Sequence, residues 1–135
     1  MTKFKKGYIY LIKNKFWNNL KKIGVSQNVN NRIKSLNTAC PENIEILHIT
    51  NELVDKYYYE YLISKYIYRY RYNNNREFYD IDEKEFIIII NFVELMNKLY
   101  DTDDKLLEYI KRNDPIYYKM RYSKLKKELF IDTTY

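Results

Sequence analysis

Glu60 is the acidic residue whose neighbours in the sequence most clearly suggest chemistry. It stands among tyrosine and aliphatic residues in the run YYYEYLI. A carboxylate is costly to bury without a partner, and this cost favours a functional reason for its position. The alternative is an ordinary surface glutamate that faces Lys56 or Ser64, four residues away on the same helix. Both interpretations stay open at this point.

Arg32 and the basic first third of the chain are typical of a protein that binds a polyanion. The 135-residue chain has a formal net charge of +6, and residues 1–50 carry nine Lys or Arg against two Glu. Nucleic acid is the expected partner, because each neutralised phosphate releases counterions. The planar guanidinium of Arg32 matches phosphate oxygens, although a solvated helix residue is the plainer alternative.

The few cysteine, histidine and glycine residues limit the kinds of site that the chain can form. Cys40 is the only cysteine, so the chain forms no intramolecular disulfide and no cysteine-based metal site. His48, the only histidine, alternates with Ile and Thr and is expected to be structural or exposed. The only two glycines are Gly7 and Gly24, and an isolated glycine in a strand marks a bulge or a close approach. We expect Gly24 to let a phosphate, or the helix of Arg32, approach the sheet.

The elements that must position these residues alternate between strands and helices. Hydrophobic spacing and turn residues predict strands at 8–12, 20–25 and 44–50, and helices at 28–37, 52–71, 82–100, 103–113 and 115–129. Asp82 with Glu85 has the spacing of a capping box. The order β-β-α-β-α, followed by C-terminal helices, predicts an α+β fold with a small three-stranded antiparallel sheet flanked by helices.

The hydrophobic segments are too short for a membrane protein. The longest purely apolar run is FIIII at 86–90, and a transmembrane helix needs about 20 residues. The first residues do not read as a signal peptide, because polar residues interrupt the segment after Gly7. We therefore expect a soluble, intracellular protein with no membrane partner.

The strand pair GYIY and KIG, with Arg32 eight residues after Gly24, resembles the GIY-YIG endonuclease superfamily. The resemblance is closest to the viral and phage branch, in which a lysine often replaces the second motif tyrosine. It covers about residues 6–90 and includes Glu77-Phe78-Tyr79, which is similar to the EWF-like end of that branch. It implies a nuclease domain at residues 1–100 and a helical extension at 101–135.

The resemblance implies a DNA endonuclease that hydrolyses phosphodiesters with one divalent metal ion, Mg²⁺ or Mn²⁺. Tyr10 matches the tyrosine of the first motif, and Arg32 matches the helix arginine. Glu60 matches the metal-binding glutamate, and Glu77 ranks second as the acidic candidate. No separate DNA-reading element is evident, so the expected sequence specificity is low.

Phosphodiester hydrolysis requires residues of the same types. It needs an activated water and charge relief on the phosphate oxygens. The pKa of a free phenol is too high for efficient general-base catalysis at neutral pH, and a nearby cation lowers it. Lys22, on the paired strand, is the expected cation beside Tyr10. The residues expected to contact nucleic acid are Lys5, Lys6, Lys21, Lys22, Gly24 and Lys34.

Three positions depart from the family pattern. Lys22 replaces the second motif tyrosine, and Leu36 and Ser64 stand where relatives often carry histidine. These departures support an alternative function, a catalytically degenerate module that binds nucleic acid or protein without cutting.

Overall fold

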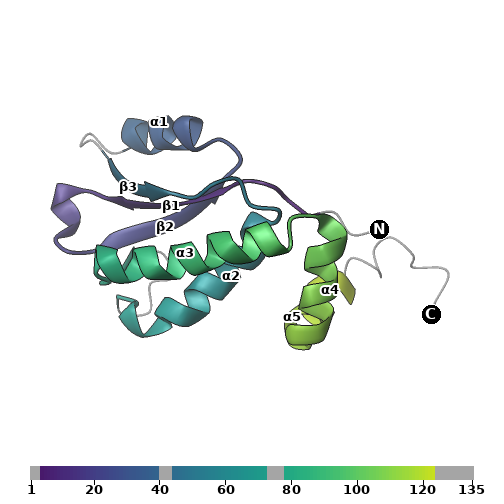
Figure 1. Ribbon diagram of the computed structural model, residues 1–135. Helices are drawn as coiled ribbons and strands as arrows, with labels where there is room; N and C mark the ends of the chain where they lie inside the picture. The colour runs from purple at the N-terminus through teal and green to yellow at the C-terminus, as the bar shows by residue number, and fades with distance from the viewer. Residues whose placement is uncertain (1–3, 40–43, 73–77, 124–135) are drawn as a thin grey trace.

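The computed structural model describes residues 4–39, 44–72 and 78–123, and it confirms the α+β fold class (Figure 1). One sheet has the strand order β3-β1-β2-β4, and all neighbouring strands are antiparallel. The strands are β1 (Tyr8–Lys13), β2 (Lys21–Ser26), β3 (Glu45–Ile49) and β4 (Phe78–Tyr79). The sequence predicts only the first three, because β4 is two residues long and too short to show an alternating pattern.

The helices cover both faces of the sheet. Helix α1 (Val29–Ala39) lies on one face, and α2 (Lys56–Ile67) and α3 (Glu83–Leu99) lie on the other (Figure 1). The remaining helices are α4 (Asp103–Asn113), α5 (Pro115–Tyr118), the 3₁₀ turns η1 (Lys15–Trp17) and η2 (Tyr68–Tyr70), and the π-helical turn η3 (Lys119–Ser123).

Strand β1 is buried on both faces, and its side chains alternate between two cores. Ile9 and Leu11 belong to the larger core under α2 and α3. Tyr10 and Ile12 pack with Val29 in a smaller core under α1. Side chains of a strand point alternately to opposite faces, so a tyrosine at position 10 must lie on the α1 side of the sheet.

Side-chain caps decide where α2 and α3 begin. Helix α2 starts at Lys56 rather than at residue 52, because Leu53 pairs with Gly7 and the Asp55 carboxylate accepts a hydrogen bond from the Tyr57 N–H. The Asp82 carboxylate caps α3 as predicted. Glu85 does not complete the capping box; its carboxylate accepts a hydrogen bond of 2.6 Å from the Tyr70 hydroxyl.

The C-terminal helices extend the larger core. Leu106 and Ile110 are fully buried in it, and the Tyr58 hydroxyl donates to the Asp114 carboxylate over 3.4 Å. Helix α4 has the predicted bounds, whereas the predicted helix 115–129 is α5 and η3 as far as Ser123, and its remainder lies outside the described residues. In the described part of the chain no helix combines the length and the apolar character that crossing a bilayer requires.

Candidate active site

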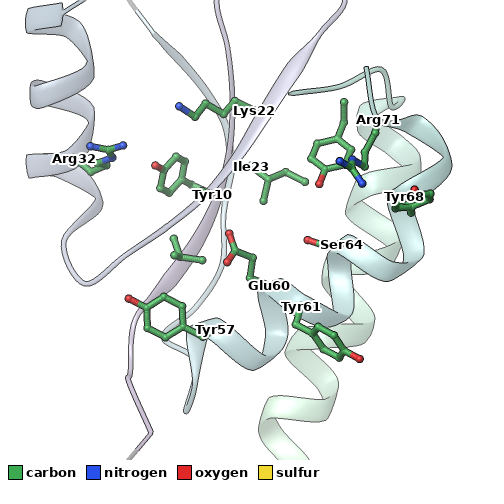
Figure 2. A pocket seen from close by; sticks show the side chains of 13 residues that line it. Tyr10, Lys22, Ile23, Arg32, Tyr57, Glu60, Tyr61, Ser64, Tyr68 and Arg71 are labelled. Carbon is green, nitrogen blue, oxygen red and sulfur yellow. The ribbon is translucent and has the colours of Figure 1, made fainter. Parts of the chain in front are cut away.

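A pocket of about 580 Å³ lies where β1, β2, α1 and α2 come together (Figure 2). It is lined by Tyr10, Lys22, Ile23, Gly24, Val25, Arg32, Tyr57, Glu60, Tyr61, Ser64, Tyr68, Arg71 and Tyr79. The pocket therefore brings together the four residues that the sequence predicts to be catalytic, one from each of these four elements. Three cationic side chains and one carboxylate line it, which suits an anionic ligand.

Gly24 provides the space that the Tyr10 ring occupies. The two residues lie directly opposite each other on β2 and β1. A Cβ atom at position 24 would lie 2.2 Å from the Tyr10 hydroxyl oxygen and 2.3 Å from Cζ. The close approach expected at Gly24 is thus made by the Tyr10 ring, and not by the helix of Arg32. The missing side chain fixes where the phenol lies in the pocket.

Gly7 plays a similar part for Lys56. A Cβ atom at position 7 would lie 2.5 Å from Lys56 Cδ and 2.8 Å from the Ser26 carbonyl oxygen. The Lys56 side chain crosses this gap and its ammonium donates to the Lys6 carbonyl over 3.2 Å. Each glycine of the chain therefore makes room for the side chain of another element.

Lys22 and Arg32 form the cationic side of the pocket. Side chains at positions 22 and 24 lie on the same face of β2, and this is the face that Tyr10 covers. Arg32 is exposed on α1 and reaches the pocket from the same side as Lys22 (Figure 2). The start of α1 is held by the Asn28 side chain, which accepts a hydrogen bond of 3.1 Å from the Asn31 N–H.

Glu60 enters the pocket from α2 and points toward Tyr10 (Figure 2). Burial raises the pKa of its carboxyl group. The surface interpretation with Lys56 is wrong, since the Lys56 ammonium bonds the Lys6 carbonyl and lies 4.6 Å from the Tyr57 ring centroid. Within the described residues the Glu60 carboxylate has neither a hydrogen-bond donor nor an ion-pair partner. It is a partly buried carboxylate whose desolvation is offset by no group of the described residues.

The oxygen groups of the pocket fit a hard divalent cation. Glu60 is accompanied there by the hydroxyls of Ser64 and Tyr10, and Mg²⁺ is commonly held by one or two carboxylates together with water and phosphate oxygens. The described residues contain no cluster of three or more His, Cys, Asp or Glu side chains that would form an all-protein metal cage. His48 lies on β3, with Nε2 4.0 Å from a Glu94 carboxylate oxygen, and does not line the pocket.

Several residues predicted to contact nucleic acid lie outside the pocket lining. Lys5 and Lys6 are exposed just before β1, and Lys34 is exposed on α1. Lys21 lies beside β4, and its ammonium donates to the Asn19 carbonyl over 3.2 Å. Glu77, the second acidic candidate, lies outside the described residues.

Apart from Glu60 and the motif position Ser64, the sequence prediction missed the α2 side of the pocket. Tyr57, Tyr61, Ser64, Tyr68 and Arg71 all line it. Tyr57, Tyr61 and Ser64 are spaced by four and three residues, which puts them on one face of α2. Tyr68 and Arg71 follow in η2 and directly after it. This periodicity was the available signal, but a stripe of tyrosines at helical spacing is also what a core produces.

Comparison with known proteins gives one family. No curated protein and no solved structure gives a significant match to the chain. Residues 7–94, which include all of the pocket lining, match the T5orf172 domain. This match extends over more than half of the sequence, so the chain belongs to the T5orf172 domain family, a family of nuclease-like or DNA-binding domains.

Proposed function

We propose that this protein is a metal-dependent DNA endonuclease of the GIY-YIG type, which hydrolyses phosphodiester bonds with low intrinsic sequence specificity. One observation carries the proposal: a phenol, a guanidinium and a carboxyl group from β1, α1 and α2 line the same pocket. Phosphodiester hydrolysis needs a proton acceptor, charge stabilisation on the phosphate and a site for a cation. The three groups match these needs one by one.

Arg32 is the group that binds the scissile phosphate. It is exposed at the pocket, so DNA reaches it without a rearrangement of the fold. Its fork of N–H donors pairs with two phosphate oxygens at once. Charge on these oxygens grows during attack, so Arg32 stabilises the transition state more than the bound substrate.

Tyr10 is the group that takes a proton from the attacking water. The residue is 2 % exposed, and its ring fills the space that the missing side chain of Gly24 leaves. Such fixed geometry favours proton transfer, since a base must lie within hydrogen-bond reach of the proton that it removes. Lys22 lies on the same face of the sheet as Tyr10.

Glu60 is the residue that would hold the metal ion, with Ser64 beside it. A bound Mg²⁺ or Mn²⁺ supplies charge neutralisation on the phosphate. The Glu60 carboxylate suits this task because no protein cation competes for it among the described residues.

Binding of DNA without cutting is the second candidate function. Among the described residues no histidine side chain lines the pocket. The lack of this proton-transfer group favours binding without cutting. Ser64 occupies the pocket where relatives often carry histidine, and Leu36 packs in the smaller core.

Nicking of supercoiled plasmid in Mg²⁺ or Mn²⁺ tests the proposal. We expect the wild-type protein and a Lys98→Ala control, altered at an exposed residue of α3, to convert plasmid to nicked circles. Glu60→Gln and Arg32→Ala should each slow nicking by at least about 100-fold. DNA binding by the wild-type protein with no cutting in either metal would favour the second candidate instead.

A further inference from the structure

The pocket has an aromatic side that the proposed chemistry does not use. Tyr68 and Arg71 lie across the pocket from Arg32 and Lys22, with Glu60 between the two sides (Figure 2). Tyr68 begins η2, directly after α2 ends. Its ring is 65 % exposed, and the Arg71 guanidinium carbon lies 4.8 Å from the ring centroid.

The exposure of Tyr68 separates it from the tyrosines that build the fold. Tyr58 and Tyr59, on the same helix, are almost fully buried in the larger core. Tyr68 belongs to neither core, and among the described residues its ring contacts the Arg71 guanidinium. A large aromatic face left open at the wall of a functional pocket is suited to a ligand.

The flat ligand that such a ring takes beside a bound phosphate is a nucleobase. Bases stack on tyrosine rings with little regard to sequence, and an arginine next to the ring adds a cation for the backbone. In a continuous duplex both faces of a base are covered by its neighbours. Only an unpaired base therefore has a face available for Tyr68.

We propose that Tyr68 and Arg71 form a subsite for one unpaired nucleotide next to the scissile phosphate. The substrate class is then DNA with a single-stranded stretch at the cut, such as a gap, a flap or a branch. This inference rests on the proposed function, because it takes Arg32 and Glu60 as the place of the scissile phosphate.

Tyr57 does not offer a second subsite of the same kind. It lies at the other end of the α2 face, and two cations lie near its ring: Lys56 Nζ at 4.6 Å and the Arg121 guanidinium carbon at 5.2 Å from the centroid. Among the described residues the Tyr68 ring has one such cation, Arg71, so more of its surface is open to a base. Its exposure is 39 %, well below that of Tyr68. The pocket is therefore built for one stacked base, on the Tyr68 side.

Fluorescence anisotropy in EDTA tests the subsite without any dependence on cutting. The probes are a labelled DNA duplex, the same sequence with a short internal gap, and the gapped DNA with abasic positions in the gap. The variants are Tyr68→Ala and Tyr68→Phe. Tyr66→Ala is the matched control, because Tyr66 is 55 % exposed on α2 but contacts Phe92 and does not line the pocket.

We expect the wild-type protein to bind gapped DNA more tightly than the duplex. Tyr68→Ala should weaken binding of gapped DNA by roughly tenfold, within the range for loss of one stacked base, and leave duplex binding unchanged. Tyr68→Phe and Tyr66→Ala should bind as the wild type does. An abasic position at the subsite should weaken wild-type binding equally and cause no further loss in Tyr68→Ala.

Equal affinity of the wild-type protein for gapped and continuous DNA would overturn the inference. So would a Tyr68→Ala variant that binds gapped DNA as tightly as Tyr66→Ala does. Failure of the proposed function has a different signature, the absence of plasmid nicking in Mg²⁺ or Mn²⁺, which this binding measurement does not involve.

Discussion

At the scale of single residues, the contact between Tyr10 and Gly24 is the one that tolerates least change. A Cβ atom at position 24 would overlap the phenol of Tyr10, a residue that is 2 % exposed. We expect Gly24→Ala to lower the free energy of unfolding by about 1–3 kcal/mol, the usual cost of overpacking. Urea unfolding measures this loss. The variant should also nick DNA more slowly, because the displaced hydroxyl leaves its position.

A double-mutant cycle with Tyr10→Ala identifies the cause. If the ring is what clashes, the loss caused by Gly24→Ala should largely disappear in the Tyr10→Ala background. A Gly24→Ala protein as stable as the wild type would mean that the ring does not need the space.

Glu60 couples stability to pH in the direction opposite to most carboxylates. Burial raises its pKa above the ordinary value of about 4.3, so between those two values the folded chain binds more protons than the unfolded chain. The free energy of unfolding therefore falls as pH rises through this interval. We expect Glu60→Gln to unfold at a higher temperature than the wild type at pH 7 in EDTA, and the difference to vanish below about pH 4.

The same pair of proteins reports on the metal. Mg²⁺ should raise the melting temperature of the wild type and leave Glu60→Gln unchanged, because a ligand stabilises only a fold that binds it. A wild type that is already the more stable protein in EDTA at pH 7 would contradict the assignment of Glu60 as a desolvated carboxylate.

At the scale of elements, the strands and helices of residues 8–113 were largely predictable. Alternating and helical hydrophobic spacing located β1, β2, β3 and α1, and the Asp82 cap located the start of α3. The late start of α2 was not predictable, since it depends on the pairing of Leu53 with Gly7, a contact between distant residues. Strand β4 likewise depends on pairing with distant residues of β2, and it also forms a bridge with Arg71.

The C-terminal helices belong to the same folding unit as the sheet. Ile110 on α4 is fully buried in the larger core, whereas Ile116 on α5 is 72 % exposed. We expect Ile110→Ala to cost about 2–5 kcal/mol of unfolding free energy, and Ile116→Ala less than about 0.5 kcal/mol. Urea unfolding should remain a single transition in both variants.

A separate early transition in Ile110→Ala, at an unchanged main midpoint, would contradict this shared core. It would mean that helices after residue 100 fold independently of the nuclease-like part. The contact of Tyr117 with Tyr58 and Tyr61, at 4.9 and 4.5 Å between ring centroids, predicts the opposite.

At the scale of the whole molecule, the candidate site was predictable in part. Motif order in the sequence pointed to Tyr10, Lys22, Arg32 and Glu60, and these residues do line one pocket. The role of Gly24 could not be predicted from the sequence, because the Tyr10 ring, which occupies the space next to it, lies on another strand. Tyr68 was not predicted either, because a chain with 17 tyrosines gives no sign of which of them line a pocket.

The net charge of +6 should make DNA binding strongly dependent on salt. We expect the slope of log K against log salt concentration to fall in magnitude by about one unit in Arg32→Ala, the effect of one lost phosphate contact. The exposed Lys98 on α3 lies outside the pocket, so Lys98→Ala should keep the wild-type slope. Equal slopes in all three proteins would remove Arg32 from the phosphate contact.

Single-turnover cutting by Tyr10→Phe, Arg32→Ala and the double variant tests most directly whether these groups act on one phosphate. Each single change should slow cutting by roughly 100-fold, a typical loss for one catalytic group. Groups that act as a unit are not additive, so the double variant should cut within about tenfold of the slower single variant. A loss in the double variant equal to the product of the two single losses, or wild-type cutting by Tyr10→Phe, would contradict the account.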